Sequence, residues 1–338
     1  MKVNLKFPQE HLFATQTTTA FASLLISLVA LSFSPILIRL GEGELSPNAI
    51  IFNRFWISTV AFLLWMGVTA IRQRLSNSQP QKQPVYTIRL LVLLLGVGFV
   101  MVATLVLWAW SLNQTSVANS TLMHNLAPVF TVLGGWLIWG KRFDMRFMFG
   151  MLVAMAGACI LAYHDFSSTT GGEFQGDLLA LLSAGFLGLY PLIVEELRTQ
   201  LSSIVIMTWC SAIGTLLLLP VMILSEDRLF PCSLSGWLTV ISLALICQIL
   251  GLGLYANCLK KLSSGFVSLC DLFVPVLSSQ EAWVIFSESP SWATLISFAV
   301  IVLGIYITSF SETVIKSSER GKILPPSTEK LSSLASNP

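Results

Sequence analysis

The stretch LMHNLAPVF, residues 122–130, places a histidine, an asparagine and a proline inside an otherwise apolar segment. The same frame returns 147 residues later as LCDLFVPVL, residues 269–277. There Asp271 stands in the place of His124, and Pro275 in the place of Pro128. Ionisable residues are costly inside a membrane helix, so two of them in one register predict a duplicated functional feature.

The chain around these two stretches has the composition of a membrane protein. It has 338 residues, 54% of them hydrophobic and 11% charged, whereas soluble domains carry about 25% charged residues. Apolar blocks follow one another, each near the ~20 residues that a membrane-spanning helix needs. Spans are predicted at 18–40, 48–70, 88–111, 115–139, 144–163, 176–196, 203–224, 235–258, 263–286 and 291–311. The predicted fold class is therefore an all-α polytopic membrane protein with ten transmembrane helices.

The ten spans form two related halves. Residues 112–160 align with residues 259–307 without gaps, and the matches include Trp136 with Trp283. Each half holds five helices, so the second half enters the membrane from the opposite side, as in the inverted repeats of alternating-access carriers. The predicted parts are an N-terminal segment (1–17), a first repeat (18–163), an extracytoplasmic linker (164–175), a second repeat (176–311) and a disordered tail (312–338).

Basic residues mark one side of the predicted membrane. If the ten spans alternate, nearly all lysines and arginines between them fall on the side that holds both termini, whereas the other side is mainly acidic. The positive-inside rule then places both termini in the cytoplasm and the protein in a plasma (inner) membrane.

Several segments resemble a known family of carriers. SPILIRL (34–40), IIFNRFW (50–56) and the long segment from Ser111 to Arg142 are similar to EamA-type members of the drug/metabolite transporter superfamily, and the second repeat is in register. The resemblance covers roughly residues 20–311 and implies a ten-helix, two-repeat transporter. One position departs from the family pattern: the fourth helix usually ends in Gly-Glu, and here it ends in Gly140-Lys141.

His124, Asn125 and Asp271 are the first candidates for substrate binding or coupling. Helix spacing places His124, Asn125 and Pro128 on one face. A helical proline also frees a backbone carbonyl four residues earlier, which is that of His124 in one repeat and that of Asp271 in the other. We expect these groups to line a central cavity; the alternative is a His124–Asp271 hydrogen bond that only joins the halves. The predicted helix-break prolines are Pro35, Pro128, Pro191 and Pro275.

Arg54, with Asn53, is the second candidate. A lone arginine inside helix two could bind a carboxylate or phosphate in bidentate fashion. It could equally reach the outer interface or pair with Glu281, which itself could gate the path. Tyr190 and Trp108 are candidate cavity walls, and packing or interface anchoring is their alternative role.

The sequence indicates no metal or cofactor site, no nucleic-acid partner and no nucleotide-binding loop, and it predicts a protein that is not an enzyme. The predicted function is secondary active transport of small amino-acid- or drug-like solutes, in the direction of efflux, by alternating access at a midplane site. A nucleotide-sugar or phosphorylated-metabolite exchanger is one alternative; a membrane scaffold or lipid-handling enzyme is another. The predicted partners are a small-molecule substrate, the lipid bilayer and the proton as coupling ion, and the sequence allows a homodimer.

Overall fold

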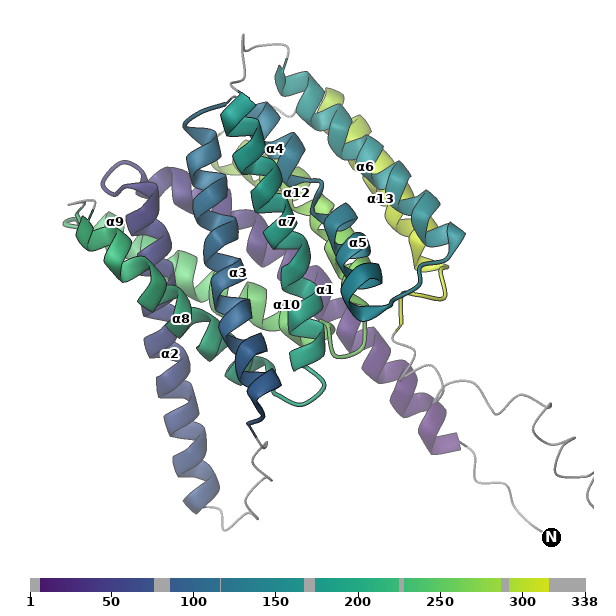
Figure 1. Ribbon diagram of the computed structural model, residues 1–338, viewed down its shortest axis with the longest axis horizontal. Helices are drawn as coiled ribbons and strands as arrows, with labels where there is room; N and C mark the ends of the chain where they lie inside the picture. The colour runs from purple at the N-terminus through teal and green to yellow at the C-terminus, as the bar shows by residue number, and fades with distance from the viewer. Residues whose placement is uncertain are drawn as a thin grey trace, which may run out of the picture.

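A computed structural model describes residues 7–75, 86–115, 117–166, 174–224, 228–286 and 292–315. The predicted linker and C-terminal tail lie largely outside these residues, as does Glu288. The described residues form ten helical segments in the order predicted, and some segments contain more than one element (Figure 1). The first repeat comprises α1 (Phe7–Gly41), α2 (Pro47–Leu75), α3 (Ile88–Leu112), α4 (Val117–His124) with α5 (Ala127–Trp139), and α6 (Met145–Phe166). The second comprises α7 (Phe174–Leu197), α8 (Ser203–Leu224), α9 (Leu234–Ser242) with η1 (Leu243–Leu252) and α10 (Gly253–Cys258), α11 (Ser264–Cys270) with η2 (Asp271–Phe273) and α12 (Val274–Phe286), and α13 (Trp292–Ser309).

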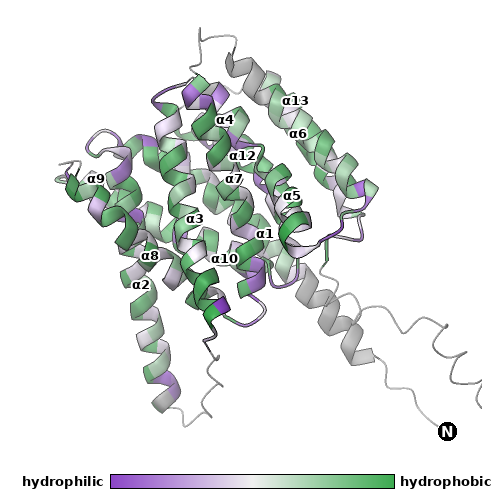
Figure 2. Ribbon diagram, viewed as in Figure 1, coloured by the Kyte–Doolittle hydropathy of each residue, from purple (hydrophilic) through white to green (hydrophobic). Residues whose placement is uncertain are grey.

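The helices carry the surface that a bilayer requires. Eight of the described segments are long and apolar enough to cross a membrane, and the apolar part of α6 is shorter, at Met145–Ile160. Apolar residues cover the outer faces of the helices and polar residues gather near their ends (Figure 2). Leu64 and Trp65 on α2, for example, are 65% and 60% exposed. In hydrocarbon the backbone must satisfy its own hydrogen bonds, which explains why these segments are helical.

Two spans are interrupted in the same register. The fourth span breaks at a turn after His124, and Pro128 lies in the first turn of α5. The ninth span narrows into the short 3-10 segment η2 at Asp271, and Pro275 follows in α12. Proline lacks the N–H that would continue the helical ladder, so both breaks follow from the repeated proline.

The other two prolines do not interrupt their helices. Pro35 lies inside α1 and Pro191 inside α7, and both helices continue past them. Each proline removes one hydrogen bond, which long membrane helices tolerate when neighbouring groups satisfy the freed carbonyl. The helix break predicted at these two positions is therefore absent.

The two repeats interlock. The first helix of each repeat packs on the third and fourth spans of the other: α1 contacts η1, α10 and α12, and α7 contacts α3 and α5. Corresponding helices also pair across the pseudo-two-fold axis, α2 with α8 and α6 with α13. The predicted all-α fold of two inverted five-helix repeats is confirmed, but the repeats are not separate bodies.

Glycines allow the closest of these pairings, between α6 and α13. A Cβ atom added to Gly150 would lie 2.7 Å from the carbonyl oxygen of Gly304, and one added to Gly157 would lie 2.9 Å from the backbone nitrogen of Ile301. The Ser297 hydroxyl donates a 2.7 Å hydrogen bond to the Gly157 carbonyl. Small residues let two membrane helices approach backbone to backbone, which makes this pair tightly packed.

Candidate functional site

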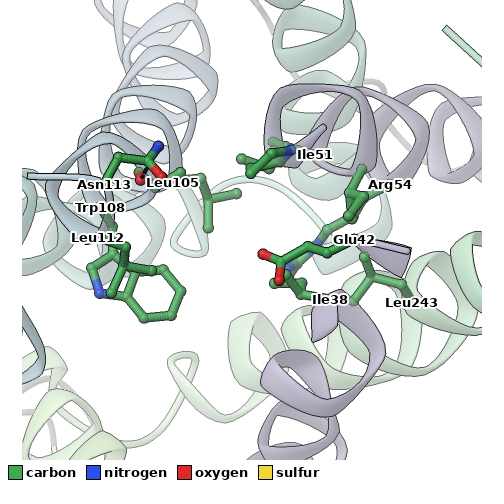
Figure 3. Close-up of a pocket in the computed structure, with 12 residues that line it drawn as sticks. Ile38, Glu42, Ile51, Arg54, Leu105, Trp108, Leu112, Asn113 and Leu243 are labelled. Carbon is green, nitrogen blue, oxygen red and sulfur yellow. Dashed lines mark hydrogen bonds between the residues drawn. The ribbon is translucent and has the colours of Figure 1, made fainter. Parts of the chain in front are cut away.

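A cleft opens between the ends of α1, α2 and α3, and we call it the Arg54 cleft. It encloses about 550 Å³ of empty space, with open solvent at its mouth included. Its walls are mostly apolar and include Ile38, Leu105 and Trp108, with Arg54 and Glu42 as its charged residues (Figure 3). Apolar walls with a few convergent polar groups are typical of small-molecule sites.

Arg54 is the buried charge of this cleft. Arg54 is only 5% exposed. Its Nε donates a hydrogen bond to Gln248 Oε1 at 2.7 Å, and its Nη1 donates one to Ser34 Oγ at 3.3 Å. No carboxylate of the described residues forms an ion pair with it, and Glu281, considered as a partner, accepts instead from Ser32 at 2.6 Å. A buried guanidinium held only by neutral groups lacks charge compensation, which an anionic ligand would supply.

Glu42 stands at the mouth of the cleft, just after the C-terminus of α1. Its exposed carboxylate is directed into the cleft, across from Trp108 (Figure 3). Neighbouring Glu44 points elsewhere and accepts backbone N–H groups of Cys232 and Ser233 at 3.3 and 3.4 Å. Hydrogen bonding from the Ser233 side chain, and then from these backbone groups, holds the pKa of Glu44 below its ordinary value.

His124 lies behind the cleft wall. Its ring stacks on Trp108 with centroids 5.2 Å apart, and its Nδ1 lies 3.1 Å from Ser183 Oγ. The Ser183 hydroxyl gives its only proton to the Thr104 carbonyl at 2.8 Å, so the Nδ1 of His124 must be the donor in that contact. His124 is thus fixed in one tautomer and supports the wall through Trp108. Asn125 lies in the turn that follows it.

Asp271 belongs to a different cluster. Its Oδ2 accepts a 2.8 Å hydrogen bond from the Tyr255 hydroxyl, while its buried Oδ1 has no partner. The Tyr255 ring lies 6.1 Å from that of Tyr190, whose hydroxyl contacts the sulfur of Met207. Asp271 and His124 share no hydrogen bond, so the alternative of a direct link between the halves is not observed.

Asn53 and Glu281 lie outside the cleft. The Asn53 amide donates to the carbonyls of Ala49 and Leu229, and its oxygen accepts from Trp56, so every bond of this side chain is structural. Glu281 lines a shallow lateral opening between α1 and α12, and its buried Oε2 has no partner there.

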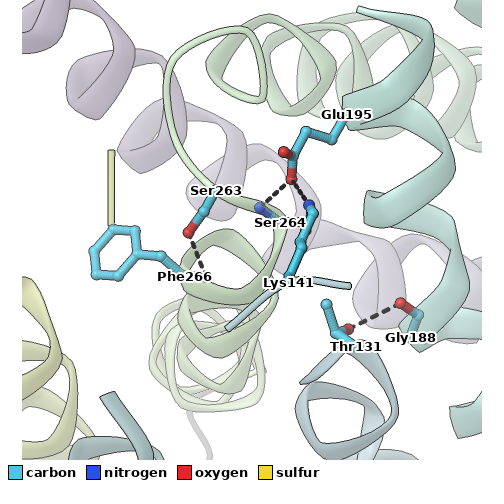
Figure 4. Close-up of polar contacts among 7 residues, drawn as sticks. All are labelled: Thr131, Lys141, Gly188, Glu195, Ser263, Ser264 and Phe266. Atoms are coloured by element: carbon cyan, nitrogen blue, oxygen red, sulfur yellow. Dashed lines mark hydrogen bonds and ion pairs between the residues drawn. The ribbon is translucent and has the colours of Figure 1, made fainter. Parts of the chain in front are cut away.

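A polar cluster ties helices together at the other end of the bundle. Lys141 Nζ lies 2.6 Å from Glu195 Oε2 and 3.0 Å from Ser264 Oγ, and the same carboxylate oxygen accepts from the Ser264 backbone N–H at 2.7 Å (Figure 4). These residues come from the end of α5, the end of α7 and the start of α11. Gly140 turns the chain into this position with φ of 61°, which a residue without Cβ adopts readily.

Contacts at the two ends of α3 show where this cluster lies relative to the cleft. Near the C-terminal end of α3, which lines the cleft, Thr115 donates to Asp177 at the start of α7. Near its N-terminal end, Arg89 pairs at 2.9 Å with Glu196, the neighbour of Glu195. The Lys141–Glu195 pair and the Arg54 cleft therefore lie at opposite ends of a helix about 37 Å long.

Sequence reasoning selected Arg54 and Trp108 as candidates, and both line the cleft, but it did not select Glu42 or the Lys141–Glu195 pair. Glu42 belongs to the mainly acidic side opposite the termini, and charge counting alone does not distinguish it from the other acidic residues there. The lysine at position 141, where the family has a glutamate, is the sequence feature that could have indicated this ion pair, because a partly buried lysine is commonly paired with a carboxylate. Among the described residues no group of three or more potential ligands could hold a metal ion.

Comparison with known proteins identifies the family. The model of the EamA-like transporter family matches residues 18–163 and again residues 174–310. The chain belongs to the EamA-like transporter family. Members of this EamA-like family are membrane transporters and not enzymes, so the scaffold and lipid-enzyme alternatives are set aside.

The EamA-like relatives whose names state a function are distant in sequence. The chain is 22% identical over 285 residues to the pseudopaline exporter CntI of Pseudomonas aeruginosa, covering 83% of this chain and 93% of the relative. It is 21% identical over 273 residues to the probable terminal-alkyne amino-acid exporter of Streptantibioticus cattleyicolor, covering 80% and 86%. A crystal structure of a protein with 20% identity aligns with a TM-score of 0.68 over 87% of this chain and 97% of its own, which shows the shared fold.

Proposed function

We propose that this chain is a secondary carrier that exports small amino-acid-like metabolites by alternating access, with the Arg54 cleft as its substrate site. The chain would lie in the plasma membrane with both termini in the cytoplasm, because the basic residues gather on the side of the termini.

The observation that carries the proposal is the uncompensated charge of Arg54. A guanidinium in an apolar cleft costs several kcal/mol of desolvation, and here only the neutral side chains of Gln248 and Ser34 hold it. A substrate carboxylate would complete the charge balance with two parallel hydrogen bonds. The geometry thus favours a solute with a carboxylate and an apolar body, and the relative from Streptantibioticus cattleyicolor, a probable terminal-alkyne amino-acid exporter, agrees with that class.

Alternating access is supported by the contrast between the two ends of the bundle. The Arg54 cleft is open at one end, while Lys141, Glu195 and Ser264 hold α5, α7 and α11 together at the other. Because the repeats interlock, the moving bodies would each contain helices of both repeats rather than one repeat apiece. The driving force would come from an ion gradient or from the substrate's own gradient.

A phosphorylated metabolite remains the second candidate, because Arg54 suits a phosphate as well as a carboxylate. One phosphate would leave charge unbalanced at a single arginine, and the apolar lining offers few further donors. We therefore favour the carboxylate.

Flux measurements in proteoliposomes test the proposal. Arg54→Lys should weaken transport of an amino-acid substrate roughly tenfold, because an ammonium cannot form the bidentate contact. Arg54→Ala should nearly abolish it at normal folded yield. Arg72→Lys, an exposed change on the same helix, is the matched control. Wild-type affinity in both Arg54 variants would refute the assignment, and preference for phosphorylated over carboxylated solutes would favour the second candidate.

A further inference from the structure

The Arg54 cleft holds two opposite charges that do not neutralise each other. Glu42 and Arg54 both line it, yet no ion pair joins them, and the Glu42 side chain has no hydrogen-bond partner among the described residues. The apolar side chains of Ile38 and Trp108 lie in the same lining. A molecule that entered this space would therefore meet a buried cation and, separately, an exposed anion.

The end of α1 contributes to this separation of charge. Glu42 follows the C-terminus of α1, where the helix dipole is negative and already disfavours a carboxylate. Arg54 lies two turns into α2, beyond the first turn in which the dipole acts, so the positive charge on that wall is the guanidinium itself. One wall of the cleft is thus negative and the other positive. A cation that binds beside Glu42 would offset the unfavourable interaction of its carboxylate with the dipole of α1.

We infer that Glu42 is a specificity-determining residue that binds the ammonium group of a zwitterionic substrate whose carboxylate lies at Arg54. This inference rests on the proposed function and adds the orientation of the substrate, with its carboxylate toward the floor and its amine toward the mouth. Simple carboxylates would bind only through Arg54. Amines without a carboxylate would leave the arginine uncompensated.

Glu44 provides an internal comparison for this role. It lies two residues away in the same loop and carries the same charge, but backbone N–H groups of Cys232 and Ser233 already engage its carboxylate. It is not part of the cleft lining. Neutralising Glu44 therefore removes one negative charge from the same end of the molecule without removing a group that faces the substrate.

Three related probes test the inference: leucine, 4-methylpentanoate, which lacks the amine of leucine, and 3-methylbutylamine, which lacks its carboxylate. Their binding to the purified full-length chain is measured by calorimetry. The wild type should prefer leucine to both others. Glu42→Gln should lower the preference for leucine over 4-methylpentanoate roughly fivefold while leaving 4-methylpentanoate affinity unchanged, because only the contact with the amine is lost. Glu44→Gln should keep the wild-type preference.

The charge-conserving variant Glu42→Asp separates a direct contact from an effect on folding, because it should retain most of the preference for leucine. An equal loss of leucine and 4-methylpentanoate binding in Glu42→Gln would overturn the inference, as would an unchanged preference or a wild type that does not discriminate. Failure of the proposed function looks different. In that case Arg54→Ala would bind all three probes as the wild type does.

Discussion

Removing the ammonium of Lys141 should loosen the end of the bundle opposite the cleft. Lys141→Met keeps the length of the side chain but removes the ammonium that pairs with Glu195. The side chains of this pair are 25% and 12% exposed, so the pair is neither fully buried nor a surface contact. The carboxylate keeps its hydrogen bond from the Ser264 backbone, and the cost should therefore fall at about 1–2 kcal/mol, below the 3–5 kcal/mol of a fully buried broken pair.

Thiol labelling measures this loosening. Cys258 is fully buried and lies shortly before Ser264 in the chain, at the same end of the bundle. In a background with the exposed Cys159 and Cys232 replaced by serine, Lys141→Met should speed labelling of Cys258 about tenfold, because 1.4 kcal/mol corresponds to a factor of ten.

Two further variants decide whether the pair itself is responsible. Arg89→Met breaks the neighbouring ion pair, whose side chains are 74% and 28% exposed, and should change labelling little, since exposed pairs contribute about 0.2–1 kcal/mol. Combining Lys141→Met with Glu195→Gln should cost less than the sum of the two, because each removes the same interaction. Unchanged labelling of Cys258 in a folded Lys141→Met protein, or additive effects in the pair, would refute the reasoning.

Three other predictions follow from the fold. Gly304→Leu should destabilise the protein by on the order of 2 kcal/mol and lower its folded yield, because a side chain there meets the α6 backbone. Gly185→Leu, which places its side chain in open space, should be tolerated, and equal folded yields of the two variants would contradict the close packing. Asp271→Asn should remove the response of transport to an imposed proton gradient while exchange survives, and retained uphill accumulation would argue against a coupling role. Reporter fusions after residue 142 should read cytoplasmic and those near residue 168 external; readings on the same side would break the inverted repeat.

The helices, and the positions at which two of them are interrupted, could be predicted from the sequence. Apolar block length predicts the spans, and proline chemistry predicts the interruptions beside His124 and Asp271. Pro35 and Pro191 show the limit of that rule, because whether a helix continues past a proline depends on neighbours that supply other hydrogen bonds.

The side-chain partners in the site were less accessible to sequence reasoning. Repeat symmetry gives His124 and Asp271 equivalent positions, but their contacts come from Ser183 and Tyr255 on other helices. Charge counting assigns Glu42 to a side of the membrane without showing that it faces a cleft. Such contacts depend on helix rotation and crossing, which hydrophobic patterning along one helix does not fix.

The interlocking of the repeats also constrains how the protein is made. The Ser27 hydroxyl of α1 donates to the carbonyl of Gly251, a residue 224 positions later in the chain. At 5–20 residues per second, a ribosome needs about 10–45 s to add that stretch. Throughout that time α1 is in place without the helix it packs on, and the Ser27 hydroxyl on its largely apolar inner face lacks its final acceptor. Premature release from the insertion machinery would therefore harm this chain more than one whose halves fold independently.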